Sequence, residues 1–322
     1  MLRARLAVIF GLVVGLVTVA AAQDKQKFET KFEKDKPFYQ KLSTKVEQTL
    51  KVTNGSDVPL KHELTFFFKW TPVTVEKDKV VAKQMVEGVK FRLSVADQTI
   101  EYDSTDTNPT GAASNPGVAE FFKNLIGSEF TVTFGKGMVV EKVDGRDDIL
   151  KKLASVNPQM ETVLRQTLSD EALKEMTDPS AGLTAPVEKG PNETWEKKGK
   201  LSLGPVGAYE RTFTYTYKGK DPEKKDLDRI EVKPSLTYQP AAATAETLPF
   251  KIKAGKIETK EVKQGIILYN PKSGRVESVR INIIIQGELD VTIQSTDTKV
   301  AIFQDQKTEL DSGDVSFLPK KP

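Results

Sequence analysis

The chain of 322 residues contains no cysteine and a single histidine, His62. Without cysteine, thiol nucleophiles, thiolate zinc sites and iron–sulfur clusters are excluded, and one histidine cannot form a histidine metal site. A histidine-based triad needs a nucleophile and an orienting acid, and the sequence has no Gly-x-Ser-x-Gly motif. We therefore expect a protein that is not an enzyme, with no metal and no cofactor, and we expect His62 to lie on the surface of a strand.

Neither sign of charge dominates, because 48 Lys and Arg residues stand against 45 Asp and Glu residues, a net charge of +3. Binding to nucleic acid needs a concentrated basic surface, so the sequence predicts no nucleic-acid partner. The content of 38% hydrophobic and 29% charged residues is typical of a globular protein with a sizeable core. Since no disulfide can form, that core must stabilise the fold unaided.

The longest uncharged apolar run lies at the N-terminus. Arg3 and Arg5 precede it, residues 6–19 form it, and three alanines ending at Ala22 follow it. This order is typical of a secretory signal peptide, with cleavage expected after Ala22. A membrane anchor is the alternative, but the run is short for a spanning helix of about 20 residues. We expect an exported protein, periplasmic or extracellular, with no transmembrane span after signal removal.

Most of the remaining chain alternates between apolar and polar residues, as strands do. Helical spacing occurs near 116–126 and 147–176, both in the first half. The pattern predicts a mainly β protein with a few helices (α+β). We expect two tandem curved antiparallel sheets, with the helical segment in the first of them.

The stretch 178–193, rich in proline and glycine, marks the predicted boundary between the two halves. We expect a signal peptide over 1–22, a flexible lead-in over 23–36, a first β-rich domain over 37–185 and a second over 186–318. In the second half, glycines are interpreted as breaks between strands. Gly255 separates 249–254 from 257–262, and Gly287 separates 275–286 from 288–295.

Two segments of the chain resemble each other. ELTFFFKW at 63–70 and ERTFTYTY at 210–217 share Glu, Thr and Phe at the same offsets and aromatics at the sixth and eighth positions. Downstream, GMVVEKV at 137–143 parallels GRVESV at 274–279, with one residue removed. Matches in consistent order suggest an internal duplication. The alternative is that strands rich in Thr and aromatics resemble one another by composition alone.

Aromatic residues at every second position give these strands one continuous apolar face. Such a face packs in a core or contacts a ligand, and Phe67 indicates that the first strand is covered on both faces. If a ligand binds, the helices of the first half would complete its site. The candidate ligand-binding residues are Phe66, Phe68, Trp70, Phe121, Leu125, Leu164 and Leu168.

Several pieces of the chain together resemble a known family. They include FYQKLSTKVEQTLKV, FFFKW, FFKNLIGSEFTVT, VDGRDDILKKL and WEKKGKLSLGPVGAYERTFTYTYKG. Their order and spacing are similar to a domain-of-unknown-function family of exported bacterial proteins, known mainly from planctomycetes, over about residues 28–310. The family has no established activity to transfer. More loosely, the expected architecture resembles the lipoprotein-carrier half-barrels of the cell envelope, although architecture does not fix function.

Paired carboxylates are the remaining route to catalysis. Asp144, Asp147 and Asp148 lie close together, but a turn followed by a helix N-terminus explains them equally well. Asp103 and Asp106 lack the spacing of a calcium loop. The sequence thus predicts a non-catalytic envelope protein acting as a structural or protein-interaction module. The alternative is a carrier or binder of a lipid or other apolar ligand in a curved sheet, with an unknown protein or that ligand as partner. A carboxylate-based hydrolase is a distant alternative.

Overall fold

A computed structural model describes residues 25–53, 55–106, 116–155, 165, 168–170, 173–174, 177–178, 187–202, 206–240, 250–293 and 295–319. The predicted cleavage site at Ala22 lies outside these residues. The elements, in chain order, are β1 (Gln26–Phe28), β2 (Phe38–Val52), β3 (Asp57–Glu76), β4 (Lys79–Val95), β5 (Gln98–Asp103), α1 (Pro116–Leu125), β6 (Glu129–Phe134), η1 (Lys136–Met138), β7 (Val140–Asp144), α2 (Arg146–Ala154), β8 (Val187–Lys189), β9 (Thr194–Ser202), β10 (Gly207–Lys220), β11 (Asp228–Pro240), β12 (Phe250–Asn270), β13 (Arg275–Ile293) and β14 (Thr296–Gly313).

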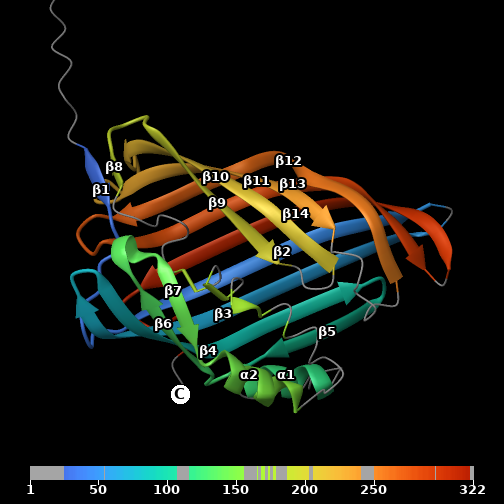
Figure 1. Cartoon of the computed structure of the whole chain (residues 1–322), viewed down its shortest axis with the longest axis horizontal. Coiled ribbons are helices and arrows are strands. Elements are labelled where there is room, and N and C mark those ends of the chain that lie inside the picture. Colours follow the sequence, from blue (N-terminus) through green and yellow to red (C-terminus); the bar gives the residue numbers. More distant parts are fainter. Residues whose placement is uncertain are drawn as a thin grey trace, which may run out of the picture.

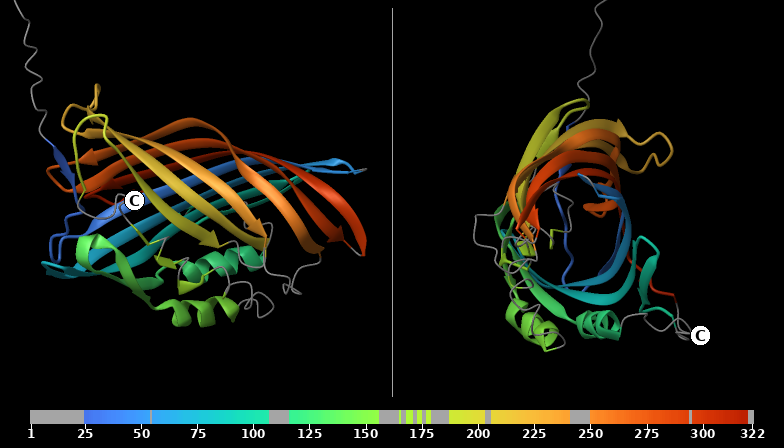
Figure 2. Two further views of the ribbon diagram at one scale, coloured as in Figure 1. Left: turned by 45° about the horizontal axis from the view of Figure 1, so that its top comes forward. Right: turned by 90° about the vertical axis from the view of Figure 1, so that its right-hand side faces the viewer.

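One large antiparallel sheet dominates the molecule (Figure 1). Its strand order is β7-β6-β4-β3-β2-β14-β13-β12-β11-β10-β9, and β5 pairs with β4. Viewed from one end, the sheet curls around an interior without closing, and α1 and α2 lie together on one side (Figure 2). A separate pair of short strands, β1 and β8, lies at one end of the sheet. The predicted mainly β, antiparallel fold with helices in the first half is confirmed.

The two halves of the chain meet in this sheet through β2 and β14. Their register runs from the pair Val300 and Val52 to the pair Gly313 and Tyr39. The sheets expected for the two halves are therefore joined edge to edge into one continuous sheet. This joint was not predictable from local pattern, because β14 pairs with a strand near the opposite end of the chain.

The two faces of the sheet differ in chemistry. Because successive side chains of a strand point to opposite faces, one face of β2, β3 and β14 carries charges while the other carries apolar and amide groups. On the charged outer face, cross-strand ion pairs recur, such as Lys45 Nζ to Glu63 Oε2 at 3.4 Å and Lys299 Nζ to Glu288 Oε1 at 2.6 Å. The inner face holds the hydrophobic clusters. The charged outer face therefore contacts water, and the hydrophobic core lies inside the curl of the sheet.

Glycines lie inside the long strands and do not end them, contrary to the sequence prediction. β12 runs for 21 residues through Gly255 and β13 for 19 residues through Gly287. A Cβ on Gly287 would overlap the carbonyl oxygen of Lys256 on β12. Gly287 therefore permits a close approach between two curved strands, next to several register shifts in the β12–β13 pair.

Residues 25–36, which the sequence suggested as part of a flexible lead-in, pack against the sheet. The ring of Phe28 is 1% exposed and its centroid lies 5.1 Å from that of Tyr217 and 5.2 Å from that of Tyr269. It also stacks on Trp195, at 5.7 Å. The two apolar rings, Phe28 and Phe32, offset the polar composition of the segment by binding it to separate hydrophobic clusters.

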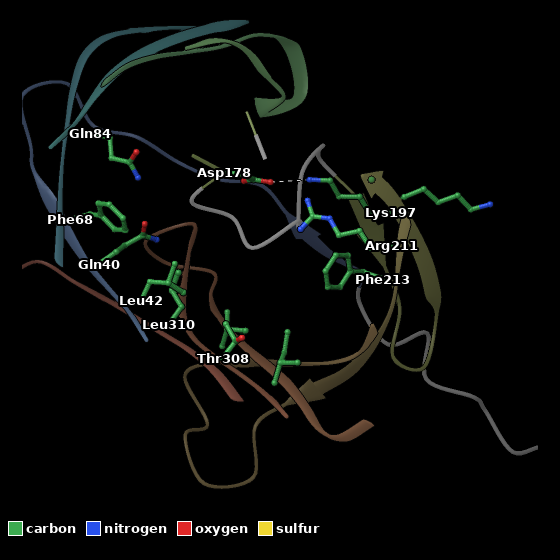
Figure 3. A pocket seen from close by; sticks show the side chains of 14 residues that line it. Gln40, Leu42, Phe68, Gln84, Asp178, Lys197, Arg211, Phe213, Thr308 and Leu310 are labelled. Atoms are coloured by element: carbon green, nitrogen blue, oxygen red, sulfur yellow. Dashed lines mark hydrogen bonds and ion pairs between the residues drawn. The ribbon is translucent and has the colours of Figure 1, made fainter. Parts of the chain in front are cut away.

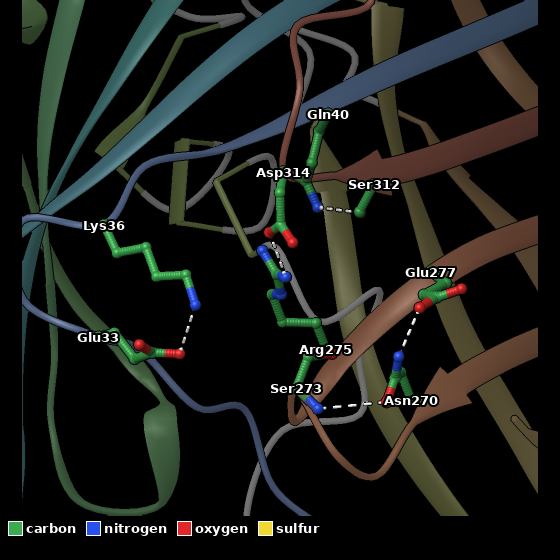
Figure 4. Close-up of polar contacts among 9 residues, drawn as sticks. All are labelled: Glu33, Lys36, Gln40, Asn270, Ser273, Arg275, Glu277, Ser312 and Asp314. Atoms are coloured by element: carbon green, nitrogen blue, oxygen red, sulfur yellow. Dashed lines mark hydrogen bonds and ion pairs between the residues drawn. The ribbon is translucent and has the colours of Figure 1, made fainter. Parts of the chain in front are cut away.

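Polar contacts reinforce the end of the sheet where this segment lies (Figure 4). The Arg275 guanidinium, at the start of β13, donates to the Asp314 carboxylate at 2.6 Å and lies 5.3 Å from the ring centroid of Phe38. On β2, the Gln40 amide donates to the hydroxyl of Ser312 at 3.1 Å. These contacts tie the C-terminal end of β14 to β2 and β13.

The outer face is locally covered where Phe67 lies, as the sequence predicted. Phe67 is 4% exposed, although it alternates with the inward side chains of β3. Gly88, beside it on β4, faces the Leu318 side chain and Phe67 itself. The Ser316 hydroxyl also donates to Glu87 at 3.0 Å. The residues after β14 therefore cross the outer face and cover Phe67.

The two similar sequence segments occupy equivalent positions in the sheet. ELTFFFKW lies in β3, the second strand of the consecutive series that begins with β2. ERTFTYTY lies in β10, the second strand of the series that begins with β9. Both series progress across the sheet in the same direction. This placement agrees with the proposed duplication, which stays a prediction.

The helices of the first half begin where the sequence predicts. α1 covers Pro116–Leu125, and Gly127 follows with a positive φ of 77°. α2 begins at Arg146, and its first turn carries Asp147 and Asp148, where acidic groups complement the helix dipole. Beyond Ser155, most of the helix predicted up to residue 176 lies outside the described residues.

The turn after β10 provides a test at acidic pH. Burial would raise the pKa of Asp221, but hydrogen bonds from the Lys224 and Glu223 backbone and from Arg229 outweigh burial and lower it. A lowered pKa stabilises the fold above the unfolded value of about 3.9, and this contribution is lost as the pH falls through the lower folded pKa. Chemical denaturation should be measured from about pH 7 to about pH 3 for wild type and Asp221→Asn. The variant should have a lower free energy of unfolding than wild type at neutral pH, and this free energy should fall less on acidification than it does in wild type.

Asp226→Asn is the matched control for this test, because Asp226 lies in the same turn with its side chain 85% exposed. Its stability should follow the wild-type pH dependence. If Asp221→Asn also followed it, the Asp221 hydrogen bonds would contribute nothing to the pH dependence.

Candidate functional site

A cavity of about 230 Å³ lies on the inner face of the sheet (Figure 3). Strands from both halves of the chain line it, together with Asp178 from the connecting segment. The lining residues are Gln40, Leu42, Phe68, Gln84, Asp178, Lys197, Lys198, Gly199, Arg211, Phe213, Val279, Ile281, Thr308 and Leu310. The cavity exceeds the roughly 150 Å³ that holds a benzene molecule and is smaller than the ~300–1,000 Å³ of typical ligand pockets.

The apolar wall of the cavity follows from strand alternation and register. Leu42 on β2 lies opposite Leu310 on β14, and Leu310 lies opposite Val279 on β13. These neighbours alternate with charged outward residues along their strands, so the register alone brings their side chains to the same inner surface. Phe213 of β10 lines the same cavity. A small apolar group would therefore contact aliphatic and aromatic side chains from both halves.

Gln40 is part of the cavity wall and is fixed in place. Its side-chain oxygen accepts a hydrogen bond from the Trp70 indole at 2.8 Å, and its nitrogen donates to the Ser312 hydroxyl at 3.1 Å. The residue is 4% exposed. These two bonds hold the amide in one orientation and satisfy the indole N–H within a buried region.

Charged groups also line the cavity. The Lys197 ammonium donates to the Asp178 carboxylate at 3.0 Å, and the Asp178 side chain is only 7% exposed. The Arg211 guanidinium lies 5.6 Å from the ring centroid of Phe213, which is within the range of a cation–π contact. The charged side of the cavity thus belongs to β9, β10 and the connecting segment, while its apolar side belongs to the strands at the centre of the sheet.

Gln84 on β4 is the functional candidate that sequence reasoning missed. It is 4% exposed, and its in-register neighbours are two buried aromatics, Trp70 and Phe130. Its amide points into the cavity (Figure 3) and forms no hydrogen bond within the described part of the chain. The amide is therefore open to a hydrogen bond with a molecule inside the cavity. The signal was a glutamine at a core position of the alternating run VVAKQMV.

The structure distributes the predicted ligand-binding residues over two environments. Among them, Phe68 lines the cavity, and Phe66 stacks on it with ring centroids 5.5 Å apart. Trp70 is fully buried and stacks on Phe38, so it belongs to the packed core beneath the cavity and not to its lining.

The helical candidates lie in the hydrophobic clusters. Phe121 and Leu125 pack against the clusters around Phe122 and Trp70, and Leu168 packs against the latter. Leu164 lies outside the described residues. α1 therefore packs its apolar side against the first half of the sheet, and the cavity lining given above contains none of its residues.

Two of the carboxylates considered for catalysis, Asp144 and Asp147, lie in ion pairs at the surface, and Asp103 was considered only for calcium. Asp144 pairs with Lys142 at 2.7 Å, and Asp147 lies 3.7 Å from the Arg146 guanidinium. Asp103 accepts hydrogen bonds from the backbone and hydroxyl of Thr105. Each of these acids therefore has a role in a turn or a helix start, and none of them lines the apolar cavity.

His62 lies on the inner face of β3, whereas the sequence suggested a surface position. It is half-buried, and its ring contacts Phe91 edge-on at a centroid distance of 5.5 Å. Burial lowers the pKa of the imidazole. Its register neighbours Val46 and Leu93 are apolar, so a neutral ring suits this position. Within the described ranges, no three His, Asp or Glu residues form a group able to hold a metal ion.

The fold and the cavity define a curled antiparallel-sheet protein with a charged exterior and a small, mostly apolar interior site. Residues 79–276, from β4 to the start of β13, match the family of unknown function DUF6263, and the chain belongs to this family. The resemblance to a family without assigned activity is thereby confirmed. No curated protein sequence matches the chain. In the part of the chain that the structure describes, no helix is long and apolar enough to cross a membrane.

Solved structures show only distant similarity to the chain. A structure of lipovitellin, described for its lipid–protein interactions, has 11% identity and a TM-score of 0.41, over 91% of this chain and 26% of that chain. An outer membrane channel from Pseudomonas putida F1 has 8% identity and a TM-score of 0.23, over 89% and 98% of the two chains. OmpF of Salmonella typhi, in complex with daunomycin, has 8% identity and a TM-score of 0.19, over 84% and 98%. The chain thus spans about a quarter of the lipovitellin chain, and these low scores carry no functional assignment.

Proposed function

We propose that this protein is an exported, non-catalytic binding protein that holds a small apolar group inside its curled sheet. The observation that carries the proposal is the cavity of about 230 Å³ between Leu42, Phe68, Val279, Ile281 and Leu310. A fully packed core would leave no such space. Ligand sites are concave and mostly apolar, with a few polar groups that set orientation. The signal-like N-terminus supports export.

The contrast between the two faces of the sheet supports the same function. The outer face carries ion pairs that are favourable in water, so apolar molecules would find little surface there. The inner face offers apolar contacts inside the curl of the sheet. Burial of apolar surface contributes about 25 cal/mol per Å², which favours the interior for any ligand small enough to enter.

A structural or protein-interaction module, the other prediction from the sequence, has less support from the geometry. The edge strands of the sheet are β5, β7 and β9. On β9, three lysines lie within four residues, Lys197, Lys198 and Lys200. Charged residues, and lysine above all, disfavour pairing of an edge with another strand. The interaction module therefore becomes the alternative outcome of the binding experiment.

The test is native mass spectrometry of the protein (residues 23–322) purified gently from its own host, together with a variant that fills the cavity. Ile281→Trp places a larger side chain into the space. Ile293→Trp is the matched control, because it changes the same residue type on the same strand at a position that is 41% exposed. Wild type and Ile293→Trp should carry an added mass that solvent extraction removes, and Ile281→Trp should not.

A bare mass for the wild-type chain would contradict the proposal and would direct the search to protein partners. An added mass present equally in all three proteins would also contradict it, because the molecule would then lie elsewhere. Near-native unfolding temperatures of both tryptophan variants would verify that each has folded.

A further inference from the structure

The side-chain amide of Gln84 lines the cavity, and its position indicates which polar group a ligand would carry. We infer that the bound molecule is an amphiphile whose neutral carbonyl or hydroxyl oxygen accepts a hydrogen bond from the Gln84 side chain. Its apolar part lies on Leu42, Phe68 and Leu310. This inference rests on the proposed function and specifies the class of ligand.

The first argument is the position of Gln84 in the sheet. The neighbours on its own face of β4 are Ala82 and Val86, which are 0% and 3% exposed. Across the strands it faces Trp70 and Phe130. Every neighbour in this set is a core side chain, and none of their side chains offers a hydrogen bond to the amide. The position would suit leucine if packing were its only role.

The second argument is the contrast with the other buried glutamines of the inner face. Gln40 bonds to Trp70 and Ser312, as described above. The Gln48 amide donates to Gln304 at 3.1 Å, and the Gln304 amide donates to Gln306 at 2.9 Å. These amides satisfy one another within the protein. Gln84 differs from them because its amide faces the cavity (Figure 3) and forms no hydrogen bond to another described residue.

The third argument concerns charge. The cations that line the cavity, Lys197, Lys198 and Arg211, belong to β9 and β10, across the cavity from Gln84 on β4 (Figure 3), and Lys197 is paired with the Asp178 carboxylate at 3.0 Å. That carboxylate would repel a second anion at the same place. Thr308, which also lines the cavity, adds a hydroxyl that suits a neutral polar group. On the side of the cavity where Gln84 lies, a neutral oxygen therefore fits better than a carboxylate does.

The test uses four probes that share an eight-carbon chain: octanamide, octan-1-ol, octanoate and octane. Binding of each probe is measured directly by isothermal titration calorimetry for wild type, Gln84→Leu and Gln48→Leu. Gln48→Leu is the matched control, because it replaces another inner-face glutamine that does not line the cavity. Wild type should bind octanamide and octan-1-ol more tightly than octanoate.

Gln84→Leu should weaken octanamide and octan-1-ol about threefold to tenfold, the effect of one hydrogen bond, and leave octane binding unchanged or tighter. Without ligand it should unfold at a higher temperature than wild type, because leucine suits its apolar neighbours. Gln48→Leu should keep the wild-type order of affinities.

The outcomes separate the two proposals. If none of the four probes binds and no copurified mass is found, the proposed function itself fails. If octane and octanamide bind wild type equally and Gln84→Leu changes neither, the cavity binds apolar groups but the inference about Gln84 is overturned. Tighter binding of octanoate than of octanamide would likewise overturn it. A water molecule bonded to Gln84 in place of a ligand oxygen would give this same insensitivity to the variant.

Discussion

Replacement of Trp70 by alanine should lower the free energy of unfolding by about 3–5 kcal/mol, the range for aromatic residues truncated in a core. Trp70 is fully buried and stacks on Phe38 with an interplanar angle of 1°. Its indole also bonds to Gln40, whose oxygen would lose its partner. Chemical denaturation of wild type and variant would measure the difference.

Phe303→Ala is the control for this experiment, because Phe303 is an aromatic residue of the same sheet that is 44% exposed. Its truncation should change stability by less than about 0.5 kcal/mol. The comparison also separates two roles for Trp70. A tryptophan that served a ligand and not the core would lose affinity on truncation while the stability of the free protein changed little, and this result would contradict our placement of Trp70.

Replacement of Phe28 by alanine should release the N-terminal segment and lower the free energy of unfolding by about 3–5 kcal/mol. Phe28 lies among Trp195, Tyr217 and Tyr269. The strand β1 pairs with β8 over only three residues, so Phe28 is the main anchor of this part of the segment, whereas Phe32 holds the part that follows. Amide hydrogen exchange across 25–36 and β8 should accelerate in the variant.

Lys27→Ala serves as the control for Phe28→Ala, because it changes the neighbouring residue, whose side chain is 49% exposed. We expect wild-type stability and wild-type exchange from it. Rapid exchange of residues 25–36 in the wild-type protein, with no further change in Phe28→Ala, would instead support the flexible lead-in that the polar sequence suggested.

The sequence predicted what depends on local pattern. Alternation identified strands, and the period-two aromatics of ELTFFFKW correctly placed Phe66, Phe68 and Trp70 on one face of β3. It could not decide between core and cavity for them, because Trp70 and Phe68 differ only by their neighbours in the sheet. That choice depends on the register between strands, which no single segment contains.

Two kinds of error have a physical cause. Gly255 and Gly287 resembled strand ends, but within this curved sheet Gly287 permits a close approach to the Lys256 backbone, and Gly255 leaves room for the side chains of Leu289 and Tyr238. Gln84 escaped notice because a glutamine at one apolar position disturbs the pattern so little. Its importance appears only when Trp70 and Phe130 are found on either side and the cavity in front of it.

The pairing of β2 with β14 determines when the protein can finish folding. β2 begins at Phe38, whereas its neighbour β14 ends at Gly313, so the joint closes a loop that contains nearly the whole chain. Pairing between such distant segments is slow, because the entropy of closing the loop is lost before the contacts form. In a chain that is synthesised from its N-terminus, one edge of β2 stays unpaired until β14 has been made. Completion of the sheet is therefore a late, post-translational event, and an exposed strand edge is the form in which the unfinished chain is most prone to aggregate.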